Sequence, residues 1–145
     1  MQNIFQIIRK YPISTLLIIG IWVICLIPIP ETPLSNVTFI DKYTHIILYL
    51  ALSLIIAFEF LRTRGYGKDE PQRYSNIVSR LSVVAFILPI LMGGIIELVQ
   101  KYCTNGVRSG DWIDFFADAF GVILAFVLTL FFIYIRNVNR VNKAG

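Results

Sequence analysis

The sequence predicts an all-α membrane protein, a polytopic bundle of four transmembrane helices. Its 145 residues are 57% hydrophobic and 15% charged, and the mean hydropathy of +0.72 is too high for an ordinary soluble domain of this size. Four long apolar stretches account for most of the chain, and the linkers between them are too short to fold alone. We therefore expect a single transmembrane domain over residues 1–145.

The four predicted spans follow from the length that a helix needs to cross a bilayer. Each helical residue adds about 1.5 Å against a hydrocarbon core of about 30 Å, so a span needs about 20 mainly apolar residues. The segments that qualify are residues 12–29, 43–61, 81–99 and 115–135. Residues 4–8, which precede Arg9 and Lys10, are expected to lie along the membrane surface as a short amphipathic turn.

Lysine and arginine in the short loops predict the orientation. Ten of the 13 basic residues fall on one side of this topology: Arg9, Lys10, Arg62, Arg64, Lys68, Arg73, Arg80, Arg136, Arg140 and Lys143. By the positive-inside rule, both termini and the loop at 62–80 are cytoplasmic, whereas the loops at 30–42 and 100–114 face outward. Because the excess of basic residues is explained by membrane topology, it gives no reason to expect nucleic-acid binding.

Acidic residues concentrate near the opposite, outer boundary. They are Asp41, Glu97, Asp111, Asp114 and Asp118. An ionised side chain at the centre of a transmembrane helix costs roughly 2.5 to 3.5 kcal/mol, so several at one level predict a shared polar pocket. At the inner boundary, Glu59 is expected to form a solvated pair with Arg62 or Arg64.

Helical spacing predicts that these residues form stripes facing one another. Asp41, His45 and Tyr49 are four residues apart, so they spread over only about 80° of one helix. Glu97 and Gln100 share a face of the next helix. A stripe of similar width on the last helix contains Asp111, Asp114, Asp118, Gly121 and Ala125. Gly121 and Ala125 are expected to form a small-residue helix contact below the acids.

Arg108 is the expected counter-charge for this pocket, because its planar guanidinium can bind a carboxylate or phosphate through two hydrogen bonds. Lys42 and Lys101 are closer to the water boundary and are expected to extend outward. The predicted ligand-binding set is Asp41, His45, Tyr49, Glu97, Gln100, Arg108, Asp111, Asp114 and Asp118. The plain alternative is a structural polar network that fixes the register of the helices and binds nothing.

The same residues, in this order, resemble the VanZ-like family of small bacterial membrane proteins. The matching residues, within about residues 40–125, are Asp41, Lys42, His45, Tyr49, Glu97, Gln100, Arg108, Ser109, Gly110, Asp111, Asp114, Ala117, Asp118 and Gly121. The resemblance implies a multi-pass protein of the bacterial cytoplasmic (inner) membrane. It also implies an association with resistance to lipid-anchored glycopeptide antibiotics such as teicoplanin. Asp118 stands where many members carry asparagine.

Two classes of function remain open from the sequence. The first is a non-enzymatic protein whose pocket binds the head group of a membrane lipid or a lipid-linked cell-wall precursor, with Arg108 on the phosphate. The second is a membrane-embedded hydrolase or transferase that acts on a lipid-linked substrate. In that case His45, oriented by Asp41, would be the general base, and Glu97 or Asp114 would be the acid or a metal ligand.

No established catalytic motif decides between these classes. The sequence has no Gly-rich phosphate loop, zinc-ligand spacing or nucleophile elbow, and it requires no cofactor. A divalent cation held by Glu97, Asp111, Asp114 and Asp118 would suit an oxygen-rich site. A proton-coupled carrier ranks last, because the inner halves of the last three predicted helices are almost entirely apolar. The sequence leaves the oligomeric state open.

Overall fold

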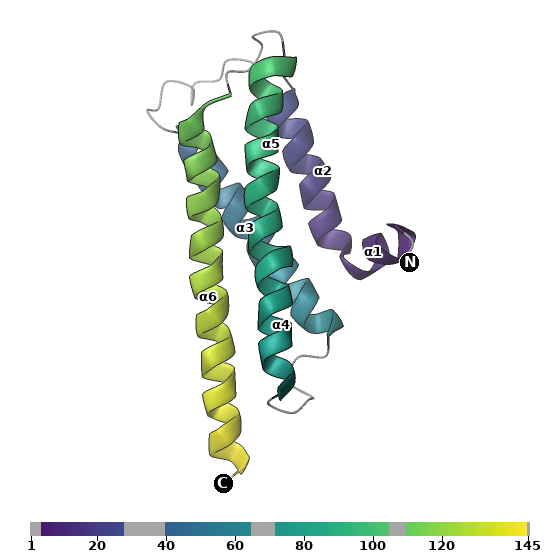
Figure 1. The fold of residues 1–145 in the computed structure, drawn as a ribbon, viewed down its shortest axis with the longest axis vertical. Helices are drawn as coiled ribbons and strands as arrows, with labels where there is room; N and C mark the ends of the chain where they lie inside the picture. Colours follow the sequence, from purple (N-terminus) through teal and green to yellow (C-terminus); the bar gives the residue numbers. More distant parts are fainter. Residues whose placement is uncertain (1–3, 28–39, 65–71, 105–109, 145) are drawn as a thin grey trace.

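The structure is a bundle of helices (Figure 1). It is a computed structural model that describes residues 4–27, 40–64, 72–104 and 110–144. The elements are α1 (Ile4–Lys10), α2 (Pro12–Leu26), α3 (Ile40–Thr63), α4 (Gln72–Ser82), the π turn η2 (Val83–Ile87), α5 (Leu88–Cys103) and α6 (Trp112–Ala144). No strand occurs in these four stretches. The predicted all-α fold is therefore confirmed.

Within the described stretches, three helices are long and apolar enough to cross a membrane: Ile40–Thr63, Asn76–Cys103 and Trp112–Asn139. They contain the last three predicted spans and extend beyond them at both ends. A fourth candidate is the pair α1 and α2, which is bent by 102°. The 15 residues of α2 cover about 22 Å, and the extended backbone of Ile27, with ψ at 141°, ends this helix before the predicted limit of residue 29.

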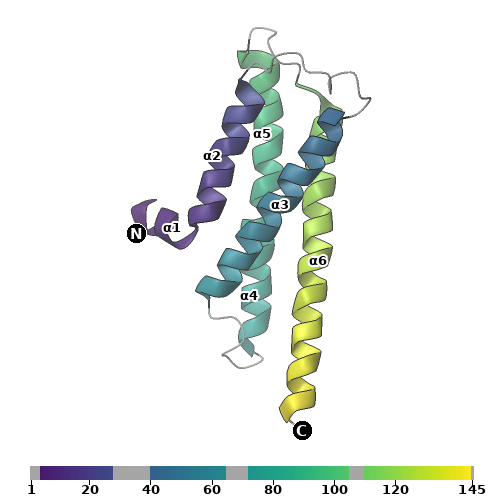
Figure 2. The ribbon, with the colours of Figure 1, turned by 180° about the vertical axis from the view of Figure 1, so that it is seen from behind.

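The helices pack in an order that Figures 1 and 2 show from opposite sides. α4, η2 and α5 follow one another along a single rod beside α6, and α3 crosses behind this rod in Figure 1. α3 and α6 share the most extensive contact, and α2 packs on α3 and α5. The starts of α3 and α6 lie beside the end of α5, and we call this the His45 end. The opposite end, where α3 ends and α2 begins, is the Glu59 end.

The central rod contains one π turn just before Pro89. Proline has no N–H to donate to the carbonyl four residues earlier, which would leave a gap in the helical hydrogen bonding. The Leu88 N–H instead bonds to the Val83 carbonyl, five residues back. Within this turn Phe86 is buried and packs edge-on against Phe126 of α6, with ring centroids 4.7 Å apart. The π turn thus keeps the span continuous and packed against α6.

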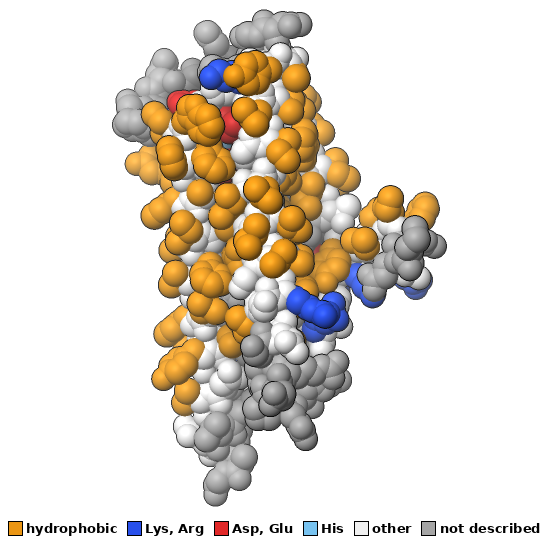
Figure 3. All heavy atoms as spheres, viewed as in Figure 1, with side chains coloured by type: hydrophobic (Ala, Val, Ile, Leu, Met, Phe, Trp, Pro, Cys, Tyr) orange, Lys and Arg blue, Asp and Glu red, His pale blue; other side chains and the backbone are white. Residues whose placement is uncertain are grey.

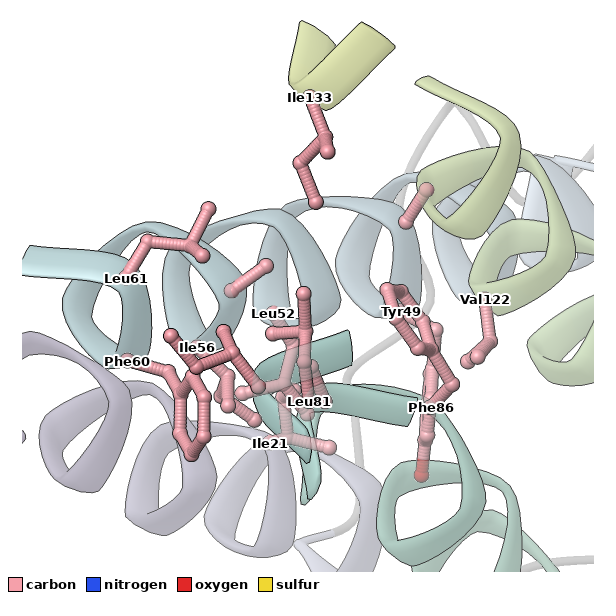
Figure 4. Close-up of a cluster of buried hydrophobic side chains, with 14 of the residues drawn as sticks. Ile21, Tyr49, Leu52, Ile56, Phe60, Leu61, Leu81, Phe86, Val122 and Ile133 are labelled. Carbon is pink, nitrogen blue, oxygen red and sulfur yellow. The ribbon is translucent and has the colours of Figure 1, made fainter. Parts of the chain in front are cut away.

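The interior is apolar through the middle of the bundle (Figure 4). Its best-buried side chains come from four different helices and include Ile21, Leu52, Leu81 and Val122. The outer flank of the molecule is also largely hydrophobic (Figure 3). On α6, for example, Phe116 and Phe120 are 65% and 57% exposed. An apolar surface over the length of several helices fits a multi-pass membrane protein.

The contact between α3 and α6 is a backbone contact at Gly121. A Cβ atom added to Gly121 would collide with the carbonyl oxygen of Ile46 and lie 3.1 Å from the backbone nitrogen of Leu50. Ala125, one turn further along α6, is completely buried. The predicted small-residue contact is present, and the surface that it packs against is the backbone of α3.

Glu59 lies inside the bundle, so the prediction of a solvated pair with Arg62 or Arg64 is wrong. Its side chain is 1% exposed. Its carboxylate accepts hydrogen bonds from the backbone N–H groups of Ile13 and Ser14, at 3.1 and 3.2 Å, and from the Ser14 hydroxyl at 2.6 Å. A carboxylate at a helix N-terminus satisfies unpaired N–H groups and favours the positive end of the helix dipole. Glu59 therefore caps α2 from a neighbouring helix.

We expect Glu59→Gln to destabilise the protein by about 1 to 3 kcal/mol, because an amide accepts these hydrogen bonds poorly and directs its own N–H group at other donors. The free energy of unfolding, measured in detergent, checks this expectation. Thr44→Ala is the control, since the Thr44 hydroxyl only bonds to the Ile40 carbonyl of its own helix at an exposed position. Equal stability of Glu59→Gln and the native protein would contradict the capping role.

Candidate functional site

The polar residues that the sequence placed in stripes come together at the His45 end. The start of α3 contributes Asp41, Lys42, His45 and Tyr49; the end of α5 contributes Glu97 and Gln100; and Asp111, Asp114 and Asp118 lie at the start of α6. Acidic side chains are visible near this end of the molecule in Figure 3. The predicted ligand Arg108 lies outside the described residues.

His45 contacts α6 through Asp118. The Nδ1 atom of His45 lies 2.8 Å from Asp118 Oδ1, and both side chains are buried. The sequence stripe favoured Asp41 as the partner of His45, but Asp41 Oδ1 is 4.0 Å from Nε2 and its side chain is 53% exposed. Asp118 thus makes the short hydrogen bond to the imidazole, and Asp41 makes only the longer contact on the other ring nitrogen. Spacing along one helix cannot show the contact with Asp118, because that contact is made across two helices.

A glycine makes room for this pair. A Cβ atom on Gly93 of α5 would lie 2.7 Å from Asp118 Oδ2 and 3.3 Å from Cε1 of Tyr49. The first distance is shorter than real Cβ contacts allow. Gly93 therefore lets α5 pack over Asp118 and Tyr49 at the level where they face each other.

Lys42 is the basic residue that enters the cluster, so the prediction that it extends outward is wrong. Its Nζ atom lies 2.5 Å from Asp114 Oδ1, 3.5 Å from Asp111 Oδ2 and 3.7 Å from Asp41 Oδ2. The side chain of Asp114 is only 6% exposed, whereas that of Lys42 is 22% exposed. Lys42 thus neutralises a buried carboxylate of α6 while its own stem remains near the surface.

Glu97 ties the end of α5 to the start of α6. Its Oε2 atom accepts a hydrogen bond of 2.9 Å from the backbone N–H of Asp111. Gly110 packs so closely that an added Cβ would collide with the Glu97 carbonyl oxygen. Glu97 Oε1 is buried and has no hydrogen-bond partner among the described residues. One oxygen of Glu97 therefore binds the start of α6, and the other is buried without a partner among the described residues.

Asp111 caps α6 and stays at the surface. Its Oδ1 atom accepts a hydrogen bond of 3.0 Å from the Ile113 N–H. This bond, with Lys42 adding its charge, lowers the pKa of the Asp111 carboxyl below its ordinary value. A lowered pKa in the folded state means that the stabilisation is present above the ordinary pKa and is lost as the pH falls through the lowered one. Asp111 therefore remains charged at neutral pH.

Of the predicted ligand residues, Gln100 bonds to another helix and the Tyr49 hydroxyl has no partner among the described residues. The Gln100 amide donates a hydrogen bond of 2.8 Å to the Cys25 carbonyl oxygen at the end of α2, so this side chain joins α2 to α5. Tyr49 is 1% exposed, and its hydroxyl has no hydrogen-bond partner within the part of the chain that is described. The Ser53 hydroxyl, next along the same stripe, is in the same situation.

A small pocket of about 40 Å³ opens beside the cluster, between α5 and the start of α6. Its lining combines Glu97 and Asp111 with Lys101 and the aromatic rings of Tyr102 and Trp112. Both rings are largely exposed, at 71% and 64%. This volume holds about one water molecule, so a lipid head group does not fit inside it.

Two groups of side chains in the cluster have donor atoms close enough to hold a metal ion. They are Asp41 with His45 and Asp114, and His45 with Glu97 and Asp118. In each group the donor atoms all lie within 4.8 Å of one another. The oxygen-only set predicted from the sequence included Asp111, which belongs to neither group. Both groups include His45, which the predicted set lacked.

We expect Lys42→Met to destabilise the protein by about 2 kcal/mol, because Asp114 would remain buried without its counter-charge. The double variant Lys42→Met/Asp114→Asn should recover part of this loss, with a coupling free energy of about 0.5 to 3 kcal/mol. Unfolding in detergent measures both values, and Lys101→Met is the control for an exposed lysine at the same end. Additive effects of the two substitutions would argue against the pair.

Comparison with known proteins assigns no family to this arrangement. No protein-family model, curated protein or solved structure matches the chain. The fold class and the membrane-spanning character therefore rest on the helices themselves, and the geometry of the cluster rests on its own distances. The resemblance to VanZ-like proteins remains a prediction from the residues at the His45 end.

Proposed function

We propose that this chain is a VanZ-like protein of the bacterial inner membrane whose His45 end faces outward. There it binds the head group of a membrane lipid or of a lipid-linked cell-envelope precursor. The order and spacing of the cluster residues support the family. Their position at one end of an apolar bundle supports recognition at the depth of lipid head groups.

The distribution of basic residues supports this orientation. Among the described side chains, the Glu59 end carries Arg62 and Arg64 at the end of α3 and Arg80 in α4. α1, which leads into α2, adds Arg9 and Lys10. At the His45 end, Lys42 is held by carboxylates. The positive-inside rule then places the Glu59 end in the cytoplasm.

The observation that carries the proposal is the excess of carboxylates at the His45 end, beside a pocket with exposed aromatic rings. Carboxylates accept hydrogen bonds from amino and hydroxyl groups, which are found in amino sugars and in ethanolamine or glycerol head groups. Tyr102 and Trp112 are suited to the membrane interface, and Lys101 at the same pocket suits a phosphate. Such a site recognises a head group that carries both a phosphate and hydrogen-bond donors.

The family resemblance connects this site to antibiotic resistance. Teicoplanin carries a lipid anchor, so it reaches its targets at the membrane surface, where the His45 end lies in this orientation. A protein that binds cell-envelope precursors at that surface would compete with the antibiotic for them. Resistance is then a consequence of binding at the membrane surface, and the activity itself is recognition of a lipid head group.

Lipid binding tests the proposal directly. The protein is purified in detergent and mixed with phosphatidylcholine, phosphatidylethanolamine, phosphatidylglycerol or a polyprenyl-diphosphate-linked amino sugar, and the retained lipid is counted by native mass spectrometry. We expect the lipids with amino or hydroxyl donors to be retained at least about 5-fold better than phosphatidylcholine, which is about 1 kcal/mol of discrimination.

The double variant Glu97→Gln/Asp111→Asn should lose this preference, because both carboxylates at the pocket are gone. Glu59→Gln is the matched control: it removes a buried carboxylate from the opposite end and should keep the preference. Equal retention of all four lipids by the native protein would overturn the proposal.

The His45 and Asp118 pair supports a second candidate, a membrane-embedded hydrolase or transferase. A carboxylate that accepts the Nδ1–H of an imidazole leaves Nε2 free to act as a general base, and the distance of 2.8 Å suits this arrangement. Glu97, with one unpaired oxygen, and Asp114 are the carboxyl groups near enough to assist. The substrate would again be a lipid-linked head group.

Turnover separates the two candidates. If the protein is an enzyme, the purified protein should release a water-soluble product from the polyprenyl-diphosphate-linked amino sugar, and His45→Gln should reduce the rate by about 100-fold or more. Thin-layer chromatography of a radiolabelled substrate measures the product. Head-group binding without turnover, in the presence of each common divalent cation, would favour the binding protein and exclude the enzyme for this substrate.

A further inference from the structure

Two carboxylate oxygens inside the His45 end are buried and unpaired. Within the described residues, Glu97 Oε1 and Asp118 Oδ2 have no hydrogen-bond partner, although their side chains are only 6% and 1% exposed. The second oxygen of each group is already used, by the Asp111 N–H and by His45. Buried polar atoms are almost always paired in native proteins, so these unpaired carboxyl oxygens call for a partner beyond the described residues.

The charge of the cluster points to a cation as that partner. Among the described residues, the five carboxylates of Asp41, Glu97, Asp111, Asp114 and Asp118 face one lysine and one histidine. Lys42 is committed to Asp114, at 2.5 Å. Even a protonated His45 would leave the cluster with an excess of negative charge. Buried charges in proteins are paired or bind metal ions.

The geometry singles out His45, Glu97 and Asp118. All three are buried, and one donor atom from each lies within 4.8 Å of the others. Donors bound to a single ion at about 2.1 Å lie roughly 3 to 3.5 Å apart in a tetrahedral site. The three donors, all within 4.8 Å of one another, are therefore near the spacing that one ion requires. The alternative group with Asp41 and Asp114 is less suited, because Lys42 already binds Asp114 and Asp41 is 53% exposed.

The surroundings of these three residues also leave space for an ion and hold the ligands in place. Gly93 keeps the space beside Asp118 Oδ2 clear, since a Cβ there would lie 2.7 Å from that oxygen. The backbone N–H of Asp111 fixes Glu97 from behind, as second-shell hydrogen bonds do for metal-binding carboxylates. The buried Tyr49 hydroxyl, also unpaired, borders the same glycine through its ring and offers a further polar group.

We propose that His45, Glu97 and Asp118 bind one divalent transition-metal ion between α3, α5 and α6. One imidazole with two carboxylates suits Zn²⁺ or Mn²⁺, whereas Mg²⁺ and Ca²⁺ prefer oxygen donors alone. With three protein ligands, the ion keeps a position open for water or an anionic ligand. This inference goes beyond the proposed function and is independent of it, because the metal site can exist whether or not a head group binds nearby.

Metal binding is measured on detergent-purified protein with its affinity tag removed and in a Cys103→Ser background, since the exposed Cys103 thiol would itself bind Zn²⁺. After chelation and dialysis, Zn²⁺ is titrated against a chromophoric chelator, Mn²⁺ by the electron paramagnetic resonance signal of the free ion, and Mg²⁺ by calorimetry. We expect one Zn²⁺ or Mn²⁺ ion per chain and binding at least about 10-fold weaker for Mg²⁺.

Variants assign the ligands. Glu97→Gln and Asp118→Asn should each weaken the binding of Zn²⁺ or Mn²⁺ by about 10-fold or more, which is the range expected when a metal-site partner is lost. His45→Gln should do the same. Glu59→Gln removes a carboxylate of similar burial at the Glu59 end and should leave the affinity within about 2-fold. This control separates loss of a ligand from loss of stability.

Absence of stoichiometric Zn²⁺ and Mn²⁺ binding by the folded native chain would overturn the site, and that result does not depend on any variant. Equal weakening in Glu59→Gln and the ligand variants would also overturn it. If Asp118→Asn does not fold, Glu97→Gln and the native titration still decide. The lipid measurements are repeated on metal-free protein to keep the two proposals separate. If the protein keeps its lipid preference but binds no metal, only the metal site is overturned.

Discussion

The close approach of α6 to α3 is the constraint on which the His45 end depends. At Gly121 the backbones of the two helices touch, with no room for a side chain against the Ile46 carbonyl. His45 precedes Ile46, and Asp118 lies one turn before Gly121, so this contact sets the distance between the imidazole and the carboxylate. In a bilayer, where lipid is as apolar as the helix surfaces, close packing of small residues is a main source of helix association. The polar pair is therefore positioned by an apolar contact below it.

Gly93 makes the same kind of contribution from α5. Its missing side chain leaves space for Asp118 and Tyr49, so three helices converge around one carboxylate. The two glycines belong to different helices and face different neighbours, but both place backbone where a side chain would push Asp118 away. Close helix contacts of this kind suit a site whose ligands need fixed positions.

The buried carboxylates at the two ends of the bundle differ in how many of their oxygens have hydrogen-bond partners. At the Glu59 end, a single carboxylate is fully occupied by two backbone N–H groups and a hydroxyl of α2. At the His45 end, Glu97 and Asp118 each keep one oxygen without a partner from the described chain. An ordinary structural carboxylate looks like Glu59. The contrast within one protein is a reason to regard the His45 end as a site that receives a ligand and not as a scaffold.

Sequence periodicity predicted the helices and the three polar stripes, because both depend on the repeat of a single helix. It failed where the partner lies on another helix. Glu59 precedes Arg62 along one helix and so suggested a surface pair, but the partner is the start of α2. Lys42 lies about 100° around the helix from Asp41 and about 60° from His45, and its long side chain reaches Asp114. The choice of Asp118 over Asp41 as the partner of His45 depends on the glycine crossing, which spacing does not encode.

The excess of carboxylates also bears on how a phosphate could approach the His45 end. An anion would meet repulsion from Asp41, Asp111 and Glu97. Of the described lysines at this end, Lys42 is already engaged, which leaves Lys101 at the pocket. A divalent ion on His45, Glu97 and Asp118 would offset much of the local negative charge and present an open coordination position to an anion. The carboxylates nearer the surface would then remain for amino or hydroxyl groups. A phosphate and its attached sugar or amine would thus find partners of opposite character at the same end of the bundle.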